Sequence, residues 1–137
     1  MVANSAVRGS SVECFDGLFP KLLFSVPENN EGSSVLHSVT ASEALDSIFL
    51  GGMIEDAMLI GSTHHSMNSA PVIIRVQLSD QEYVWRQQYT IDGVDWLSAT
   101  ALAVNPVGNA MVAFLTHTHP GLYVKTNYLL AVDPANG

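Results

Sequence analysis

Cysteine is nearly absent from this 137-residue chain, which carries only Cys14. A single cysteine cannot form an internal disulfide, so a disulfide-stapled scaffold is excluded. Nothing beside Cys14 in the sequence would activate its thiol, and the motifs of serine hydrolases, zinc proteases and phosphate-binding glycine loops are missing. We therefore expect a protein that is not an enzyme and that has no catalytic residues, no cofactor and no bound metal.

Positive charge is also scarce, because five Lys and Arg face 13 Asp and Glu, for a formal net charge of −8. Lysine occurs only at Lys21 and Lys125. Phosphate binding needs clustered cations, so nucleic acid is excluded as a partner, and an anionic membrane surface is disfavoured for the same reason. No apolar run approaches the roughly 20 residues that span a bilayer, so membrane insertion is not expected.

Charged residues of both signs make up only 13% of the chain, about half the usual share for globular proteins. A surface with few charges and many Ser, Thr and Asn residues suits a secreted, O-glycosylated protein. N-glycosylation is not expected, because the sequence contains no Asn-x-Ser/Thr site. We therefore expect an extracellular or cell-surface glycoprotein.

Apolar residues are plentiful, at 47% of the chain, and they alternate with polar residues in several segments. Residues 72–79 ("VIIRVQLS") alternate with a period of two, which predicts a half-buried strand. Residues 82–89 ("EYVWRQQY") follow a turn and would place Tyr83, Trp85 and Gln87 on one face of a second strand.

Residues 98–115 ("SATALAVNPVGNAMVAFL") predict a β-hairpin. Pro106 fixes φ early in the turn, and Gly108 can adopt the positive φ that other residues avoid. Asp92-Gly93 predicts a turn in the preceding loop. Residues 127–132 ("NYLLAV") predict a further strand after the hairpin.

The hairpin has a counterpart upstream when the sequence is shifted by 63 positions. Residues 37–52 then fall on residues 100–115, with matching polarity and turn placement but essentially no identities. With a shorter intervening loop, "VIIRVQLSD" falls on "YLLAVDPAN". Such self-similarity is typical of repeat architectures. The sequence therefore predicts tandem repeats of about 60 residues, at 20–80 and 81–137, preceded by an N-terminal arm at 1–19.

Local propensity at residues 40–50 also fits a helix. Thr40 and Glu43 make a capping box, and the apolar residues that follow have helical spacing. We prefer strand, turn and strand here, because the repeat register and a stop at Gly51-Gly52 both suit a hairpin. The next stretch, residues 53–61 ("MIEDAMLIG"), is equally ambiguous.

The second unit is similar to a known family of β-propeller repeats, the SBBP repeats. The resemblance is carried by a Trp strand, an acidic-Gly loop, an A-x-A-V segment, a Gly-Asn turn and an apolar-Asp strand end. Phe114-Leu115 stands where the family has a Gly pair. The resemblance implies an all-β protein of two antiparallel propeller-like blades and implies no enzyme, because propellers host many functions. The matching residues are Trp85, Asp92-Gly93, Ala101–Val104, Gly108-Asn109, Val112 and Val132-Asp133.

Two blades would leave apolar faces and sheet edges uncovered, because a propeller needs about four to eight blades. By analogy with the strand after residue 80, a further strand is expected after "DPANG", and the sequence ends before it. Residues 1–19, with the β-prone "SSVECF", could close the chain's own sheet or complete the sheet of another copy. The chain could also be part of a longer protein.

The function predicted from these features is structural. We expect a non-catalytic homo-oligomer or homopolymer that assembles through exposed β edges, as a subunit of an extracellular filament or surface layer. The alternative is a carbohydrate- or protein-binding propeller module, completed by oligomerisation or by a longer chain, with a glycan as a conceivable partner.

Two pairs of histidines are candidates for metal ligands. His117 and His119 form an H-x-H pair that would face one side of a strand, as suits Zn²⁺ or Cu²⁺, and Asp133 is conceivable as a third ligand. His64 and His65 form the second pair. Histidines near turns are more often ordinary loop residues, so we expect no metal.

Aromatic and acidic residues suggest two further kinds of site. Three aromatics could form a sugar-stacking face, although large aromatics are buried on average, which favours a packing role. Four acidic residues could supply oxygen ligands to Ca²⁺, although their spacing matches no EF-hand and acidic turn residues commonly make local hydrogen bonds. We prefer the packing and local roles for these residues: Trp85, Trp96 and Tyr123 among the aromatics, and Glu55, Asp56, Asp92 and Asp95 among the acids.

Overall fold

Every regular element in the described residues is a β-strand. The computed structural model describes residues 2–6, 9–16, 19–26, 34–54, 70–94, 96–118, 121 and 124–137, with the backbone alone for the first three strands. The strands are β1 (Val2–Ala6), β2 (Gly9–Asp16), β3 (Phe19–Val26), β4 (Ser34–Ser42), β5 (Ser47–Ile54), β6 (Ala70–Gln77), β7 (Tyr83–Gln88), β8 (Leu97–Val104), β9 (Met111–Thr118) and β10 (Lys125–Val132).

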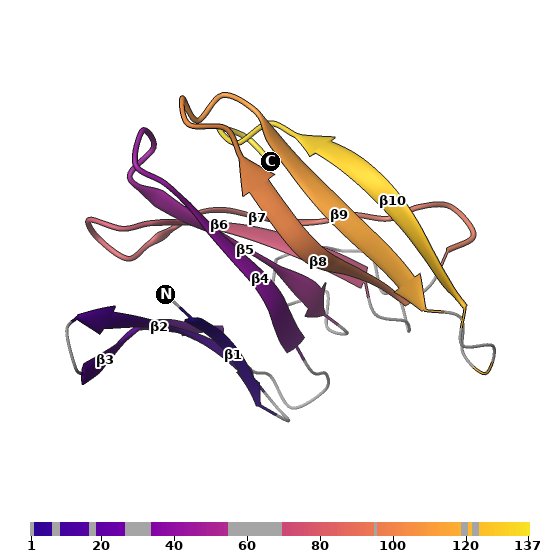
Figure 1. Ribbon diagram of the computed structural model, residues 1–137, viewed down its shortest axis with the longest axis horizontal. Coiled ribbons are helices and arrows are strands. Elements are labelled where there is room, and N and C mark those ends of the chain that lie inside the picture. The colour runs from indigo at the N-terminus through magenta and orange to yellow at the C-terminus, as the bar shows by residue number, and fades with distance from the viewer. Residues whose placement is uncertain are drawn as a thin grey trace.

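The described strands form three antiparallel sheets, in the orders β1-β2-β3, β4-β5-β6-β7 and β10-β9-β8 (Figure 1). The prediction of an all-β protein with two antiparallel, blade-like sheets is therefore confirmed by β4–β7 and β8–β10. The predicted turn at Pro106 and Gly108 is also confirmed, because Gly108 has a φ of 72° and its N–H donates to the carbonyl of Asn105 at 2.9 Å.

The helix considered for residues 40–50 is wrong. The chain continues as β4, turns at residues 43–46 and returns as β5. Ile48, Phe49 and Leu50 are all fully buried, on alternate faces of a sheet that is covered on both sides. That burial outweighs the local capping signal, since tertiary packing supplies most of the stability of an element. Gly51-Gly52 does not stop the strand but lies inside β5.

The two hairpins share one pairing register under the predicted shift of 63 positions. A β-bulge interrupts the β4–β5 pairing between Leu36 and Ser38, and the β8–β9 pairing is interrupted between Ala99 and Ala101, at the shifted positions. A β-bulge is a specific feature of a sheet rather than a defect, so bulges at equivalent positions indicate a structural repeat. Pairs also correspond on both sides of the turns: Val39–Leu50 with Leu102–Ala113, Thr40–Phe49 with Ala103–Val112, and Ala41–Ile48 with Val104–Met111.

β7 belongs to the first of the two sheets, because it pairs with β6. The predicted boundary between residues 80 and 81 therefore does not coincide with the boundary between the sheets. A bulge between Arg75 and Val76 places Trp85 opposite Arg75 and Tyr83 opposite Val76. Adjacent residues of a strand point to opposite faces, so the prediction that Tyr83 and Trp85 share a face is wrong.

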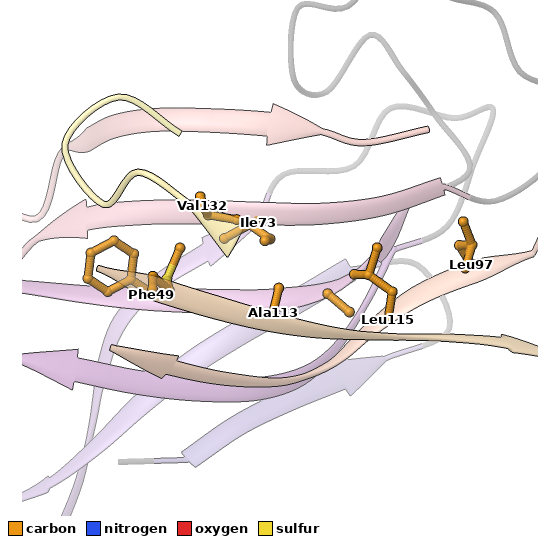
Figure 2. Packing of buried hydrophobic residues seen from close by; sticks show 8 residues of the cluster. Phe49, Ile73, Leu97, Ala113, Leu115 and Val132 are labelled. Carbon is orange, nitrogen blue, oxygen red and sulfur yellow. The ribbon is translucent and has the colours of Figure 1, made fainter. Parts of the chain in front are cut away.

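The sheet β8–β10 lies across one side of the sheet β4–β7, with β8 packed beside β4, β5 and β6 (Figure 1). The side chains between these sheets form one core, whose buried residues Figure 2 shows from close by. This core consists of Phe49, Ile73, Leu97, Ala99, Met111, Ala113, Leu115 and Val132.

The opposite side of β4–β7 carries a second buried cluster. As a result, β6 is buried on both faces, and the prediction that it is half-buried is wrong. The alternation of apolar and polar residues shows only that the two faces of the strand differ in polarity. It does not show that a second sheet will cover the more polar face. The second cluster consists of Leu36, Ile48, Leu50, Val72, Ile74 and Val76.

The predicted N-terminal arm contains strands of its own. Residues 2–6 and 9–16 pair with each other, and the latter pairs with β3. β1 and β2 lie beside β4, with no backbone ladder recorded between β1 and β4 among the described residues. In this structure, the arm therefore extends neither of the blade-like sheets.

Candidate functional site

The side of β8–β10 that faces away from β4–β7 carries apolar residues in the open. Side chains of β9 alternate between the core and this side, so Val112 and Phe114 point outward while their neighbours are buried. Val112 is 44% exposed and Leu129 is 73% exposed. We call this surface the outer face. It consists of Ala101, Ala103, Val112, Phe114, Leu129 and Ala131, which are paired across the three strands.

The equivalent face of the first sheet is covered. Phe49 lies opposite Arg75 in β6, as Val112 lies opposite Ala131 in β10. Phe49 is fully buried in the core between the sheets, and Arg75 is only 9% exposed. The same face of the repeated unit is therefore covered in the first sheet and open in the second.

β10 is an edge strand among the described residues, because its only recorded neighbour is β9. The first sheet has β7 at the corresponding position beside β6. An edge strand presents unpaired backbone N–H and C=O groups, which another strand can satisfy. The second sheet thus offers both an apolar face and an edge.

The turn after β10 is hydrogen-bonded to side chains of the first sheet. The indole Nε1 of Trp85 donates to the carbonyl of Pro134 at 3.0 Å, and Nη1 of Arg75 donates to the same carbonyl at 3.1 Å. The ring of Trp85 lies 6.0 Å from that of Phe49. Trp85 therefore has a packing role, which confirms the interpretation preferred from sequence.

A groove of about 610 Å³ opens at the other end of the second sheet, where β8 begins and β9 ends. Trp96 stands at its rim, 41% exposed and with a φ of 58°. The packing role preferred for Trp96 from the sequence is not seen in either core cluster, because Trp96 belongs to neither. The groove is lined by His37, Met53, Trp96, Ser98, Thr100, Thr116, Thr118 and Lys125.

Hydroxyl groups are linked across this groove. Oγ1 of Thr100 lies 3.0 Å from Oγ1 of Thr116, which in turn donates to Oδ1 of Asn127 at 3.1 Å. Ser98 is 8% exposed, and its Oγ has no hydrogen-bond partner among the described residues. Sequence analysis did not single out His37 or these hydroxyl residues, because only the bulge and the pairing of three strands bring them together.

His117 does not lie near Asp133, which the sequence suggested as a conceivable third metal ligand. His117 is buried in β9 and pairs with Thr126, at the start of β10. Asp133 follows the end of β10, roughly 23 Å further along at the rise of a strand. His119, His64 and His65 lie outside the described residues, within which no group of three or more metal-ligating side chains is found.

Asp133 instead holds the last turn. Its carboxylate accepts the N–H of Ala135 at 2.9 Å and Nδ2 of Asn136 at 2.7 Å. The hydrogen bond from the N–H of Ala135 contributes most to lowering the pKa of the Asp133 carboxyl, and the hydrogen bond from Asn136 lowers it further. Asp133 therefore has the local role that is common for acidic turn residues.

The three aromatic residues do not form one sugar-stacking face. Trp85 contacts the turn after β10, whereas Trp96 precedes β8 at the opposite end of that sheet. Tyr123 lies outside the described residues. Of the acidic residues, Asp92 is exposed in the predicted turn, where Gly93 has a φ of 74°, while Glu55, Asp56 and Asp95 lie outside the described residues.

No protein-family model, no curated protein and no solved structure matches this chain. The resemblance to the propeller repeats therefore stays a prediction. Within the residues that the structure describes, there is no helix long and apolar enough to cross a membrane.

Proposed function

We propose that this chain is a non-catalytic structural protein that assembles with further copies of itself through its second sheet. The observation that carries the proposal is the outer face, which is open in β8–β10 although the equivalent face of β4–β7 is buried. An exposed apolar patch rimmed by polar residues is typical of an interaction site. The occupant that suits it best is a sheet of the same kind, supplied by a second copy.

The edge strands support the same proposal. β10 of one copy presents an unpaired edge, and β7 of another copy presents a different one among the described strands. Pairing between two different edges is a heterologous contact, which closes into a ring or propagates as a filament. We place the assembly outside the cell, as a filament or surface layer, because the sequence has few charges and many hydroxyl residues that O-glycosylation could modify.

Leu129→Glu tests the outer face in the full chain. The substitution places a charge at the most exposed apolar residue of that face, where docking would have to desolvate it. We expect native mass spectrometry and negative-stain electron microscopy to show rings or filaments for the wild type. The apparent dissociation constant of the variant should rise at least about tenfold.

Val107→Glu is the matched control. Val107 is 66% exposed in the turn between β8 and β9, away from the outer face, so this variant should assemble as the wild type does. A wild-type chain that stays a monodisperse monomer of 14.7 kDa at high concentration would sink the proposal, as would equal effects of the two substitutions.

The alternative function, a carbohydrate- or protein-binding module, depends on a different part of the molecule. The groove beside Trp96 is the observation that favours it. Its residues are distinct from those of the outer face, so the two functions can be tested separately.

A further inference from the structure

Trp96 has a backbone conformation that its own side chain disfavours. Its φ of 58° lies in the left-handed region, which bulky residues rarely adopt. Strained residues of this kind cluster at binding sites, where the surrounding structure holds them in place. Here the conformation leaves a large part of the indole exposed at the rim of the groove, outside both cores.

The position of Trp96 aligns it with other lining residues. Trp96 directly precedes Leu97, and Leu97 pairs with His117 of β9. The next residue of β9 is Thr118, which pairs with Lys125 of β10, so Trp96, Thr118 and Lys125 follow one another across the end of the sheet. An apolar ring surface, a hydroxyl and an ammonium group therefore succeed one another along one side of the groove. The linked hydroxyls of Thr100 and Thr116 lie on the same lining.

The described residues that line the groove carry charge of the opposite sign to the net charge of the chain. The formal net charge is −8, yet none of the described residues that line the groove is acidic, and Lys125 and His37 are among them. Lys125 is one of only five Lys and Arg residues in the sequence. A flexible ammonium group with no carboxylate among the described lining residues suits an anionic ligand group.

We infer that this groove binds an acidic saccharide. The apolar face of a sugar ring lies against the indole of Trp96, since indole offers a flat, amphipathic surface. The sugar hydroxyls exchange hydrogen bonds with the threonine hydroxyls, which both donate and accept. The carboxylate of the sugar lies at Lys125, and the imidazole of His37 contributes a further polar contact. This inference does not rest on the proposed self-assembly.

Isothermal titration calorimetry with trigalacturonic acid and with the neutral galactotriose tests the inference. The full chain should bind the acidic trisaccharide at least about tenfold more tightly than the neutral one, as a charge-assisted hydrogen bond implies. Trp96→Ala should weaken binding of both sugars at least about tenfold. Lys125→Gln should remove the preference for the acidic sugar and leave the affinity for the neutral one unchanged.

Arg86→Gln is the matched control, because it removes the same charge from an exposed strand position away from the groove. It should bind both sugars as the wild type does. Absence of binding by either sugar, equal affinity for both, or unchanged binding by Lys125→Gln would overturn the inference. The same titrations on Leu129→Glu separate it from self-assembly, since that variant should assemble more weakly but should still bind the sugar.

Discussion

At the scale of single residues, the guanidinium of Arg75, buried between the sheets, is held by dipoles rather than by an opposite charge. Arg75 donates from Nε to Oγ of Ser47 at 3.0 Å and from Nη1 to the carbonyl of Pro134, and its guanidinium lies 5.9 Å from the centre of the Phe49 ring. No carboxylate among the described residues is recorded within salt-bridge distance of it. A guanidinium tolerates this setting because it is weakly hydrated and stacks on aromatic rings.

Tyr89 is a buried polar group that lacks such partners. Its Oη lies buried without a hydrogen bond among the described residues, and burial raises the pKa of the phenol to about 12. Tyr89→Phe removes the unsatisfied hydroxyl and should stabilise the fold by about 1 kcal/mol. Chemical unfolding followed by circular dichroism at pH 7 measures the change.

The same substitution should alter the pH dependence of stability. The unfolded chain releases the Tyr89 proton near the usual phenol pKa of 10.0, whereas the folded chain holds it to about pH 12. Between these values the unfolded state binds fewer protons, so the free energy of unfolding falls as pH rises. The advantage of Tyr89→Phe over the wild type should grow between about pH 9 and pH 11, and Tyr128→Phe serves as the control. A constant difference would contradict the assignment.

At the scale of elements, the close approach of β4 beside the bulge of the first hairpin explains Gly52 inside β5. Gly52 lies opposite Leu36, next to the bulge. A methyl group added at Gly52 would overlap the carbonyl oxygen of Val35 and lie 2.9 Å from Cα of Leu36. Since these are backbone atoms, β4 could approach so closely only beside a residue without a side chain. The second hairpin has Leu115 at the equivalent position, buried in the core.

Gly52→Ala should therefore disrupt the β4–β5 pairing. We expect a loss of about 3 kcal/mol in the free energy of unfolding, at the upper end of overpacking costs, because the clashing atoms belong to the backbone. Gly93→Ala is the control. Gly93 has a positive φ but nothing within 4 Å of an added methyl group, so Gly93→Ala should lower the free energy of unfolding by about 1 kcal/mol. Equal losses would show that the close approach of β4 is not the cause.

At the scale of the whole molecule, the two repeated units of the chain have different surroundings. The first sheet is packed on both sides, whereas the outer face of the second is open. Sequence similarity between the units is low because each side chain has adapted to its own surroundings: Phe49 in the first unit corresponds to Val112 in the second, and Arg75 corresponds to Ala131. The pairing register is retained, because it depends on strand length and on the bulge.

A pair of substitutions measures this difference. Phe49→Ala should cost about 3–5 kcal/mol of stability, because it leaves a cavity between the sheets. Val112→Ala, at the equivalent position, should cost the monomer less than about 1 kcal/mol but weaken self-association. Urea unfolding at a protein concentration too low for assembly measures the stability of the monomer. Sedimentation at a higher protein concentration measures self-association. A large loss of monomer stability in Val112→Ala would mean that the outer face is not open.

Most strands of the two blade-like sheets, the turn at Pro106 and Gly108, and the repeat could be predicted from the sequence. Alternation of apolar residues, the Pro106–Gly108 turn and the 63-residue shift are all properties of neighbouring residues or of equally spaced ones, so no tertiary contact was needed to read them. The same local signals could not exclude a helix at residues 40–50, since Thr40 and Glu43 suit a helix start as well as a hairpin.

Which faces are covered and which residues share a site could not be predicted from such local patterns. The bulge in the pairing of β7 with β6 places Tyr83 and Trp85 on opposite faces, and the hydrogen bond from Trp85 to Pro134 joins residues 49 positions apart. The groove likewise unites His37, Trp96 and Lys125 from three different strands or their ends. These arrangements depend on how one sheet lies across another, and the packing of two sheets is fixed by the fit of their side chains, which no local pattern records.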